Sequence, residues 1–394
     1  CTGFCKSMEQ KKITYCLVNN LGGITTMLQN VIRYGGKESM AQEAVLLNIK
    51  ENKAAAITGD FCEGLHTTTF NFSNKENWYH VFKKLADIAG ASPGLLVTND
   101  VYDMLMLTYY NIPKRVVQMV HDGYNVQLAV LYNDVVDAFI CHSYFFYETM
   151  CQLFPARRND IYFLPYGVPV SGYKRQPAKN DMPLKLFFLG RHDKQKGIFN
   201  LLEIENHLSK SGVPADWLIL GRGPETAALK KQWEGKNNVA FNTPSTNDDV
   251  LKAISQRDVL VFPTTFEGFP VALAEAMSVG CVPVASNLPG GLREVVKDGD
   301  NGFLCDADNV VAFAEKIKWL HHNRQQLENM SSNAASLIAG KYNVLHQSPK
   351  YQQLFASLAL AKGTPRHHSV KRKLGSRLDQ PWLPAAVTKV LRGK

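Results

Sequence analysis

Short β-forming runs alternate with helical stretches along nearly the whole chain of 394 residues, and this alternation constrains the fold most strongly. Successive strands joined by crossover helices lie parallel, so the pattern predicts parallel sheets covered by helices. The chain is too long for one ordinary hydrophobic core, which predicts two domains. We therefore expect an α/β protein with two doubly wound parallel-sheet domains.

The expected strands are placed by their β-rich composition. In the first half they lie at 13–18, 44–49, 95–98, 116–120, 138–141 and 161–164, with helices that include 25–34, 78–89 and 144–153. In the second half they lie at 184–189, 217–220, 239–241, 259–262 and 282–285, with helices from about 310 to 321 and onward to about 360. The polar stretch 168–177, with its Pro and Gly residues, is typical of an interdomain linker.

Composition narrows the function classes. Apolar residues make up 45% and charged residues 20% of the chain, as in soluble globular proteins, and no apolar run is long enough to span a bilayer. The eight cysteines show no C-x-x-C pair and no metal-ligand spacing, which favours a reducing cytoplasm. Residues 1–7 lack the apolar core of a secretory signal, and we expect them to precede a natural start at Met8.

Positive charge is concentrated at the end of the chain. Residues 363–394 carry eight Lys or Arg and one Asp, a net charge of +7 out of +9 for the whole chain. The remainder is nearly neutral, which argues against a general nucleic-acid-binding surface. In the tail, Trp382 and several aliphatic residues accompany the cations, a combination typical of contact with an anionic membrane leaflet. The alternative is a tail that is disordered or packs on the first domain.

Two glutamates eight positions apart, Glu267 and Glu275, bracket an expected junction between a loop and a helix. Pro270 suits the first helical position, where its missing N–H costs nothing, so Glu267 falls in the loop and Glu275 in the helix. Uncapped amides of the first turn, near Val271, can bind phosphate or sugar hydroxyls. The alternative is an ordinary strand-to-helix turn with two solvated glutamates.

Two further loops of the second half follow expected strands, and ligands of doubly wound sheets bind beyond the carboxyl ends of strands. Arg191 and Lys196 could clamp a diphosphate, or they could be solvated loop charges. Gly221 opens a Gly-Arg-Gly-Pro turn whose backbone could border a nucleobase. Two Asp-x-Asp patterns, at 298–300 and 306–308, could hold a divalent metal, but their Gly- and Asn-rich surroundings indicate turns.

In the first half, Gly22 and Gly23 follow the first strand and allow backbone amides to approach a phosphate, with Thr25 as a possible helix cap. The alternative is a tight turn; the pattern is not the G-x-G-x-x-G fingerprint, which weakens an oxidoreductase interpretation. His121 closes an apolar strand beside Asp122 and could contact a substrate hydroxyl or share a proton. The alternative is a partly buried, hydrogen-bonded histidine.

Together these segments resemble glycosyltransferase family 4, the retaining, nucleotide-sugar-dependent, group 1-like enzymes with the GT-B fold. The E-x7-E pair and the Gly-Arg-x4-Lys-Gly motif at 190–197 match the family, and segments 289–296 and 298–304 are similar to those that usually follow. In the first half, the glycine-rich loop and His121 match as well. The segment 241–244 departs from the usual Phe-x-Gly, and 38–94 matches nothing in the family that we can name.

The resemblance implies two Rossmann-like domains that face each other across a cleft and close around the substrates. They would comprise an acceptor-binding domain at 8–178 and a nucleotide-sugar-binding domain at 179–345. A helix at 346–362 would cross back to the first domain, and the basic tail would follow at 363–394. The implied reaction moves a hexose-type sugar from a nucleotide diphosphate sugar to an acceptor hydroxyl, by a front-face route with retention and without metal. A UDP-sugar is favoured over a GDP-sugar.

The resemblance also implies roles for individual residues. Catalytic roles fall to His121, Glu267, Arg191 and Lys196. The donor would be bound by Gly22, Gly23, Arg191, Lys196, Gly221, Gly268, Phe269, Pro270, Val271 and Glu275. Glu267 would orient the donor sugar, Glu275 would hold the ribose, and His121 would touch the sugar.

The expected setting is the synthesis of bacterial cell-envelope polysaccharide, lipopolysaccharide or glycolipid. The protein would act in the cytoplasm, as a peripheral protein on the inner face of the membrane. Its partners would be a nucleotide sugar, a glycan or lipid-linked acceptor and an anionic membrane surface, but no nucleic acid. Two alternatives remain open: a nucleotide-sugar 2-epimerase of the same fold, and a non-catalytic protein that binds glycans or lipids.

Overall fold

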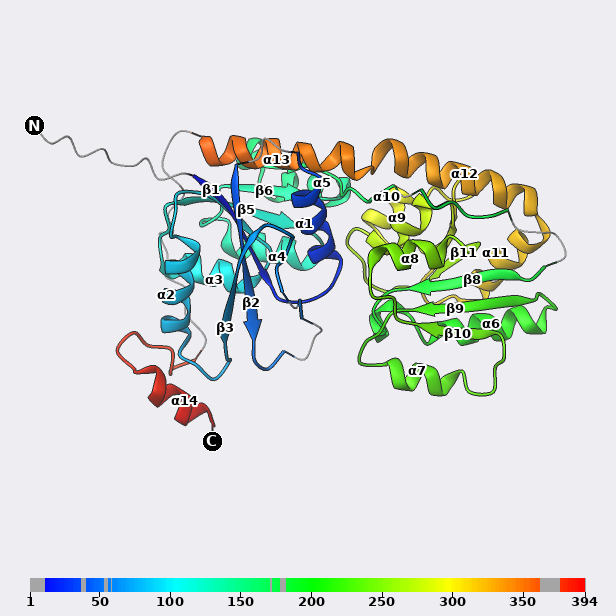
Figure 1. Cartoon of the computed structure of the whole chain (residues 1–394), viewed down its shortest axis with the longest axis horizontal. Coiled ribbons are helices and arrows are strands. Elements are labelled where there is room, and N and C mark those ends of the chain that lie inside the picture. The colour runs from blue at the N-terminus through cyan, green and yellow to red at the C-terminus, as the bar shows by residue number, and fades with distance from the viewer. Residues whose placement is uncertain are drawn as a thin grey trace, which may run out of the picture. The chain divides into compact units, whose positions relative to one another are not determined.

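The computed structural model describes residues 11–36, 40–52, 56–57, 59–170, 172–177, 182–361 and 376–393, and the description below is confined to them. The expectation about residues 1–7 lies outside these residues. The chain divides into two compact units (Figure 1). Unit 1 contains the chain up to His142, residues 146–164 and everything from Ser348 onward, whereas unit 2 contains 143–145 and 165–347. The change between units at 164 and 165 falls upstream of the stretch that the sequence suggested as a linker.

Unit 1 is built on a seven-stranded parallel sheet in the order β3-β2-β1-β4-β5-β6-β7. Its strands are β1 (Lys12–Val18), β2 (Ala41–Ile49), β3 (His66–Phe72), β4 (Gly94–Thr98), β5 (Lys114–Val120), β6 (Ala138–Cys141) and β7 (Ile161–Phe163). The six strands expected from the sequence are confirmed, with small differences at their ends. Strand β3 was not expected; it lies at the edge of the sheet and buries only two of its side chains, Phe70 and Phe72.

Helices connect these strands and extend the unit at its C-terminal end. They are α1 (Gly23–Arg33), α2 (Trp78–Ala89), α3 (Val101–Tyr109), α4 (Gly123–Tyr132), α5 (Tyr144–Leu153), the 3-10 helix η1 (Pro155–Asp160), α13 (Val344–Leu360) and α14 (Ala385–Gly393). Helix α13 starts in unit 2 and continues in unit 1. It supplies Tyr351 and Phe355, both fully buried, and Phe355 packs edge-on against Tyr15 of β1. The C-terminal chain therefore completes the core of unit 1.

Unit 2 holds a six-stranded parallel sheet in the order β10-β9-β8-β11-β12-β13. Its strands are β8 (Leu184–Leu189), β9 (Ala215–Leu220), β10 (Val239–Asn242), β11 (Val259–Phe262), β12 (Val282–Ser286) and β13 (Phe303–Cys305). The five expected strands are confirmed, and the three-residue β13 is added. The helices are η2 (Lys194–Lys196), α6 (Asn200–Lys210), α7 (Thr226–Gln232), α8 (Asn247–Ile254), α9 (Val271–Ser278), α10 (Gly291–Val295), α11 (Val310–His322) and α12 (Arg324–Lys341).

Both sheets are doubly wound, because the strand order reverses beside the first strand of each. In unit 1 the reversal lies between β1 and β4, and in unit 2 it lies between β8 and β11. The central strands β4, β6, β11 and β12 are buried along their whole length, since helices cover both faces of a parallel sheet. Such sheets bind ligands outside the carboxyl ends of their strands at the reversal, so the fold points to the loops after β1, β4, β8 and β11.

Arg175 corrects the interpretation of 168–177 as a plain linker. Its side chain is buried in unit 2 and pairs with Asp258 at 2.9 Å and with Glu328 at 2.5 Å. Its backbone N–H donates to the Val279 carbonyl oxygen. A buried cation without these carboxylates would be costly, so this part of the stretch is fixed to unit 2 by an ion-pair network.

Two expectations from composition can be compared with the structure. Across the residues that the structure describes, no helix has the length and apolar character needed to cross a bilayer. The described cysteines, Cys16, Cys62, Cys141, Cys151, Cys281 and Cys305, are unbridged and buried. Burial raises the pKa of the Cys62 thiol to about 11, so this sulfur behaves as a packed, unreactive group.

Candidate functional site

The candidate residues of unit 2 gather at the carboxyl edge of its sheet. Arg191 and Lys196 follow β8, Gly221 follows β9, and the loop from Glu267 to Pro270 follows β11. Strands β8 and β11 are neighbours at the point where the strand order reverses. The motifs that lie far apart in the sequence therefore meet at the position where doubly wound sheets bind ligands.

The two principal motifs of unit 2 touch through an ion pair. Lys196 Nζ lies 2.8 Å from Glu267 Oε2, and both side chains are largely buried. The loops that carry them are tied by backbone contacts, because the Thr265 N–H donates to the Gln195 carbonyl oxygen at 2.8 Å. At Gly197, where φ is +66°, a Cβ would overlap the Pro263 carbonyl oxygen, so the close approach of the loops requires glycine.

Arg191 is held by a carboxylate that the sequence analysis did not single out. Its Nε lies 2.5 Å from Asp193 Oδ2, and 55% of the Arg191 side chain remains exposed. Asp193 also caps η2, where it accepts the Lys196 backbone N–H. One aspartate thus organises both cationic residues, and Asp193 belongs to the candidate site. Its only sequence signal was its position between the two cations.

The start of α9 differs from the prediction by one residue. Helix α9 begins at Val271, and Pro270 is the N-cap with φ −83° and ψ 78°, instead of the first helical residue. The shift arises because the Val271 N–H donates to the Phe269 carbonyl oxygen, which completes a turn before the helix. A proline N-cap carries no side-chain acceptor, so no side chain caps this end of α9. Because the Val271 N–H is used in this turn, the amides of Ala272 and Leu273 are the ones left to bind a phosphate or a hydroxyl.

Phe269 and Gly268 shape this loop from within unit 2. The Phe269 side chain is buried and packs against Tyr166, with ring centroids 4.9 Å apart, and against Tyr342 at 5.4 Å. Any contact of Phe269 with a ligand must therefore come from its backbone. The Gly268 carbonyl oxygen accepts the N–H of Gly291, the first residue of α10, where a Cβ would overlap that oxygen. This contact brings the segment after β12 to the same loop.

Glu275 lies on the buried side of α9, with 6% of its surface exposed. Burial raises the pKa of its carboxyl to about 7, and a hydrogen bond with the Asn247 side chain lowers that pKa in part. Asn247 is the first residue of α8. Glu275 is therefore a carboxyl that gains or loses its proton near neutral pH.

The glycines after β9 have a structural explanation of their own. At Gly221, where φ is +124°, a Cβ would overlap the Gly190 carbonyl oxygen, and at Gly223 it would overlap the His192 carbonyl oxygen. This packing alone requires glycine, so the proposed border with a nucleobase stays a prediction. A hollow of about 510 Å³ lies near the end of β10, where the chain departs from the family pattern. It is lined by Asn242, Thr243, Pro244, Ser245, Asp249, Lys252, Ala253 and Gln256.

In unit 1, the glycine-rich loop forms an uncapped helix start. Gly22 is the N-cap of α1, its φ of 177° is ordinary extended backbone, and a Cβ there would meet no atom within 4 Å. Gly23 is the first helical residue, and no side chain caps this end. Thr25 is not the cap that the sequence suggested, because its hydroxyl donates back to the Asn20 carbonyl oxygen. The space beside Gly22 and the amides of α1 are compatible with a bound anion.

His121 lies at the carboxyl end of β5 and is almost fully buried. Its Nε2 is 2.9 Å from Asn99 Oδ1, and its backbone N–H donates to Asn125 Oδ1. Burial lowers the pKa of His121 to about 3, so the imidazole is neutral at neutral pH. Asp122 caps α4 by accepting the Asn125 N–H, a role that the sequence did not suggest for it.

The neutral imidazole is part of a larger buried network. His121 stacks on His142, with ring centroids 4.9 Å apart and 24° between the planes. His142 Nδ1 lies 2.7 Å from Tyr351 Oη of α13 and 3.1 Å from the Leu164 carbonyl oxygen. Burial and the neighbouring His121 lower the pKa of His142 as well. The hydrogen bonds of His121 agree with the alternative of a hydrogen-bonded histidine, although its burial is more complete than expected. A contact between His121 and a ligand at the carboxyl edge stays a prediction.

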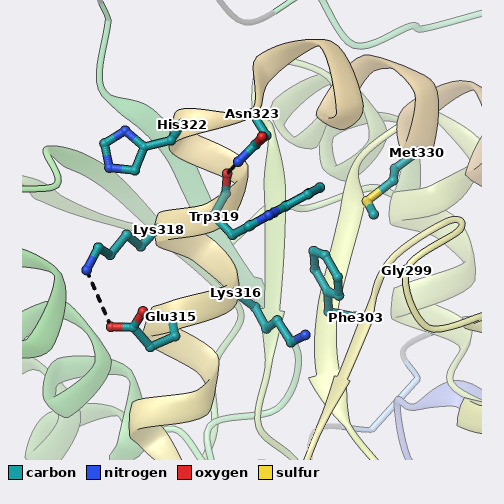
Figure 2. A pocket seen from close by; sticks show the side chains of 9 residues that line it. All are labelled: Gly299, Phe303, Glu315, Lys316, Lys318, Trp319, His322, Asn323 and Met330. Atoms are coloured by element: carbon teal, nitrogen blue, oxygen red, sulfur yellow. Dashed lines mark hydrogen bonds and ion pairs between the residues drawn. The ribbon is translucent and has the colours of Figure 1, made fainter.

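A second hollow in unit 2, of about 520 Å³, lies beside Phe303, the first residue of β13 (Figure 2). Trp319 of α11 meets Phe303 edge-on at 5.4 Å, and Lys316 Nζ lies 4.5 Å from the Phe303 ring centroid. The other lining residues are Gly299, Glu315, Lys318, His322, Asn323 and Met330. The hollow is at the amino end of β13 and contains none of the predicted site residues, so it is separate from the candidate site.

Within the described part of the chain, no three His, Cys, Asp or Glu side chains gather as metal ligands would. The two Asp-x-Asp segments form turns, as expected: the Asp300 N–H donates to the Lys297 carbonyl oxygen, and the Asn309 N–H donates to the Asp306 carbonyl oxygen.

Comparisons with known proteins agree with this geometry. Residues 171–337 match the family model described as glycosyl transferases group 1. The chain is 27% identical over 188 residues to a protein of Salmonella typhimurium that is provisionally named colanic acid biosynthesis glycosyltransferase WcaL. The matched region covers 45% of this chain and 46% of that protein. The chain is also 31% identical over 166 residues to phosphatidyl-myo-inositol mannosyltransferase of Mycolicibacterium smegmatis, a match that covers 40% of this chain and 42% of that protein. The matched regions thus span less than half the length of these two curated relatives.

A solved structure matches over more of the chain. HepE of Anabaena, in complex with UDP, superimposes with a TM-score of 0.68 and 18% identity, and the match covers 88% of this chain and 100% of that one. At this identity the likeness shows the fold alone. The expected fold class is confirmed: two Rossmann-like parallel-sheet units of the GT-B type.

Proposed function

We propose that this protein transfers a hexose-type sugar from a nucleotide diphosphate sugar to an acceptor hydroxyl, with retention of configuration, since residues 171–337 match the glycosyl transferases group 1 model. The observation that carries the proposal is the contact between Lys196 and Glu267 at the reversal of the unit 2 sheet. It joins the cationic motif after β8 to the glutamate pair around the start of α9. A diphosphate and the sugar attached to it need these two kinds of group side by side.

The reaction breaks the bond between the anomeric carbon and the diphosphate oxygen and forms a bond from the acceptor oxygen to that carbon. The acceptor proton passes to a phosphate oxygen of the donor on the same face of the sugar, the front-face route that the family resemblance implies. Arg191, Lys196 and the uncapped amides of α9 stabilise the negative charge on the departing diphosphate. His121 keeps the role that the resemblance implies for it, a contact with the donor sugar.

Binding of the diphosphate requires an exchange of partners within unit 2. Arg191 now pairs with Asp193, and Lys196 pairs with Glu267. When the phosphates take over these cations, the Glu267 oxygen that now pairs with Lys196 can accept a hydrogen bond from a sugar hydroxyl. This exchange links occupation of the diphosphate position to orientation of the sugar.

Donor and acceptor follow from the relatives by analogy. UDP is bound in the solved structure of HepE, which supports a UDP-sugar over a GDP-sugar. The two cations and the helix start supply positive charge, so we expect activity without a metal, testable with EDTA. The names of the relatives refer to colanic acid and to phosphatidyl-myo-inositol, which supports a glycan or lipid-linked acceptor in bacterial envelope synthesis. The protein would then work in the cytoplasm, at the inner face of the membrane.

A donor screen tests the proposal. UDP- and GDP-sugars are added to the full chain, and thermal stabilisation and slow donor hydrolysis are recorded. A ligand at about 100 times its Kd adds about 2.7 kcal/mol of stability, so the true donor should stand out. Conversion of the donor into its 2-epimer without acceptor would favour the epimerase instead. Stabilisation without any turnover, with or without glycan acceptors, would favour a non-catalytic binding protein.

A further inference from the structure

The C-terminal helix α14 has its apolar side turned away from the protein. All five of its Ala, Val and Leu residues are exposed, including Val387 at 43%, Val390 at 64% and Leu391 at 50%. Thr388 is fully buried instead, and its hydroxyl donates to the Leu378 carbonyl oxygen. Surface helices of soluble proteins normally bury the apolar stripe and expose the polar one, so α14 is inverted.

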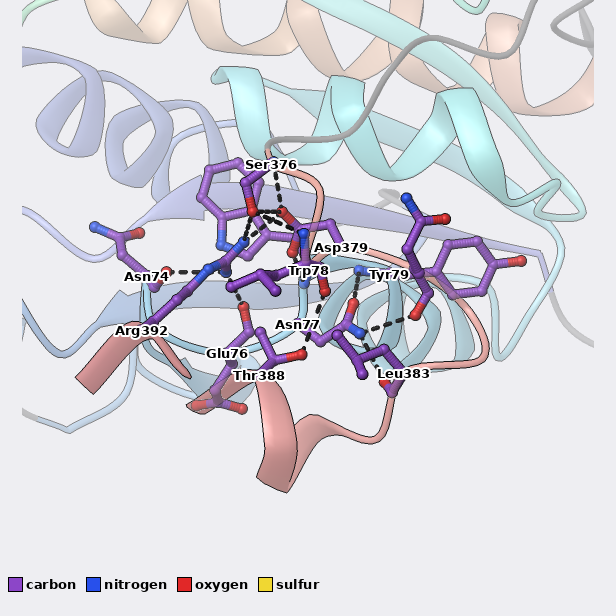
Figure 3. A network of polar contacts seen from close by, with 12 residues as sticks. Asn74, Glu76, Asn77, Trp78, Tyr79, Ser376, Asp379, Leu383, Thr388 and Arg392 are labelled. Carbon is purple, nitrogen blue, oxygen red and sulfur yellow. Dashed lines mark hydrogen bonds and ion pairs between the residues drawn. The ribbon is translucent and has the colours of Figure 1, made fainter. Parts of the chain in front are cut away.

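The inversion is held by a polar contact with the start of α2 (Figure 3). The Asp379 side chain is buried, accepts the Trp78 backbone N–H at 2.8 Å and pairs with Arg392 of α14 at 2.5 Å. Arg392 also donates to the carbonyl oxygens of Asn74 and Glu76. We call these residues the α14 clasp: Asn74, Glu76, Trp78, Asp379 and Arg392.

A second set of bonds holds the chain before the helix. Asn77 is fully buried; its Oδ1 caps α2 by accepting the Tyr79 N–H, and its Nδ2 donates to the carbonyl oxygens of Gln380 and Leu383. The hydrogen bonds and the ion pair that attach this segment to unit 1 come from polar groups, and the apolar side chains Val387, Val390 and Leu391 remain 43–64% exposed. Trp382, between the two attachment points, is 75% exposed.

The exposed side combines aliphatic residues at helical spacing with positive charge. Val387, Val390 and Leu391 share one face, since residues three and four apart are neighbours on a helix. Lys389 and Arg377 are exposed in the same segment. The one acidic residue of 363–394, Asp379, is buried in the clasp and paired with Arg392, so it is not presented on this side beside the exposed Lys389 and Arg377. An apolar stripe with tryptophan and cations fits the interface of an anionic lipid leaflet.

A protein partner fits less well. Stable interfaces bury about 800 Å² on each side, and the exposed face of a nine-residue helix is a small part of that. We propose that α14 is an anchor to anionic membrane, with Trp382, Val390 and Leu391 entering the lipid interface and the α14 clasp holding them outward. The inference deepens the proposed function, because it rests on the proposed work at a membrane surface and names the residues that make the contact.

The test measures binding of the full chain to vesicles of phosphatidylcholine with 30% phosphatidylglycerol, compared with phosphatidylcholine alone. Val390→Ser combined with Leu391→Ser should weaken binding to the anionic vesicles about tenfold or more, because two aliphatic side chains no longer enter the interface. Melting temperature and donor-induced stabilisation should not change. The matched control is Val130→Ser with Leu131→Ser, an adjacent pair on α4 that is 49% and 57% exposed; this pair should bind like the unchanged protein.

Three results would overturn the anchor. They are equal binding to neutral vesicles, equal loss in the control pair, and a dimer in sedimentation that the Val390→Ser and Leu391→Ser pair dissolves. Tryptophan fluorescence gives a second readout besides vesicle binding. The emission should shift to the blue on anionic vesicles, and Trp382→Phe should remove that shift. Donor-induced stabilisation without vesicles tests the proposed function separately, so failure of one proposal is distinguishable from failure of the other.

Discussion

The carboxyl edges of the two sheets differ in how they handle charge. In unit 2, ionisable side chains stand in ion pairs: Arg191 with Asp193 and Lys196 with Glu267. In unit 1, the carboxyl edge carries the imidazole of His121 at the end of β5, and burial keeps this imidazole neutral. Unit 2 is therefore equipped to bind a highly charged group such as a diphosphate. Unit 1 is equipped to offer uncharged hydrogen bonds.

The contrast extends to protons. His121 and Glu275 are both buried, and burial disfavours the charged form of each. Burial therefore lowers the pKa of the His121 imidazole and raises the pKa of the Glu275 carboxyl. The two units should therefore respond in opposite directions when the pH changes.

The largest effect is expected from removing the cations of unit 2. Arg191→Ala with Lys196→Ala should weaken UDP binding by about 100-fold or more, because hydrogen bonds to charged groups contribute about 1.5–3 kcal/mol each. Isothermal titration calorimetry measures this. The matched control is Lys194→Ala in the same loop, whose side chain is 78% exposed; its affinity should stay within about twofold. Equal losses in both variants would mean that loop charge in general, and not this pair, binds the nucleotide.

The next effect concerns the proton of Glu275. Its pKa is about 7 in the folded protein and 4.5 as an ordinary glutamate, so the folded state binds more protons between these values. The stability contribution is fully present below pH 4.5 and is lost as the pH rises through 7, a change of roughly 3 kcal/mol. Glu275→Gln should abolish this dependence. Hydrogen exchange in β11, compared between the two proteins at pH 5 and pH 8, checks it; parallel curves would refute the assignment.

His121 should show the reverse dependence. Its folded pKa is about 3 against an ordinary 6.5, so the unfolded state binds more protons between these values. Stability from this group is present above pH 6.5 and falls by about 1.4 kcal/mol per pH unit below it. Between pH 6.5 and 5, exchange in β5 should accelerate less in His121→Gln than in the unchanged protein. Identical acceleration would exclude His121 as the buried group responsible.

The smallest effects are expected for glycine-to-alanine substitutions at the carboxyl edges of the two sheets, where the two glycines should differ in their cost in unfolding free energy. Gly221→Ala places a Cβ against the Gly190 carbonyl oxygen at a positive φ and should cost about 1–3 kcal/mol of unfolding free energy. Gly22→Ala meets open space at an ordinary φ and should change stability by less than about 0.5 kcal/mol. Chemical denaturation gives both values. A large cost at Gly22 would show that its loop, too, is fixed by packing instead of being open to a ligand.

Much of the fold could be predicted from the sequence, because buried parallel strands are continuous apolar runs. The exceptions follow the same physics. Strand β3, His-Thr-Thr-Thr-Phe-Asn-Phe, lies at an edge and has too few apolar residues, and β13 has only three residues. Arg175 lies in polar sequence typical of a linker, and its buried ion pairs depend on distant residues that no local pattern reveals.

The site could be predicted only where its residues are close in sequence. The spacing of Glu267 and Glu275 and the cations after β8 predicted positions that the structure brings to one edge. Asp193 and Asn99 were missed because their importance comes from what they hold, Arg191 and His121. The helix start at Val271 was displaced by one residue, since a turn through Phe269 precedes it.

Unit 1 is built from segments that lie before and after most of unit 2 in the sequence, so it cannot be completed until unit 2 has been synthesised. Its sheet ends with β7 at Phe163, yet Tyr351 and Phe355, which fill its core, are made nearly two hundred residues later. At about 5–20 residues per second, a ribosome needs about 10–40 s to cover that distance. Unit 2, whose chain is almost continuous, can fold in this interval. Strand β1 thus leaves the ribosome before unit 2 but belongs to the unit that is completed after it, and a nascent chain stopped before Ser348 would expose the face of β1 that α13 covers.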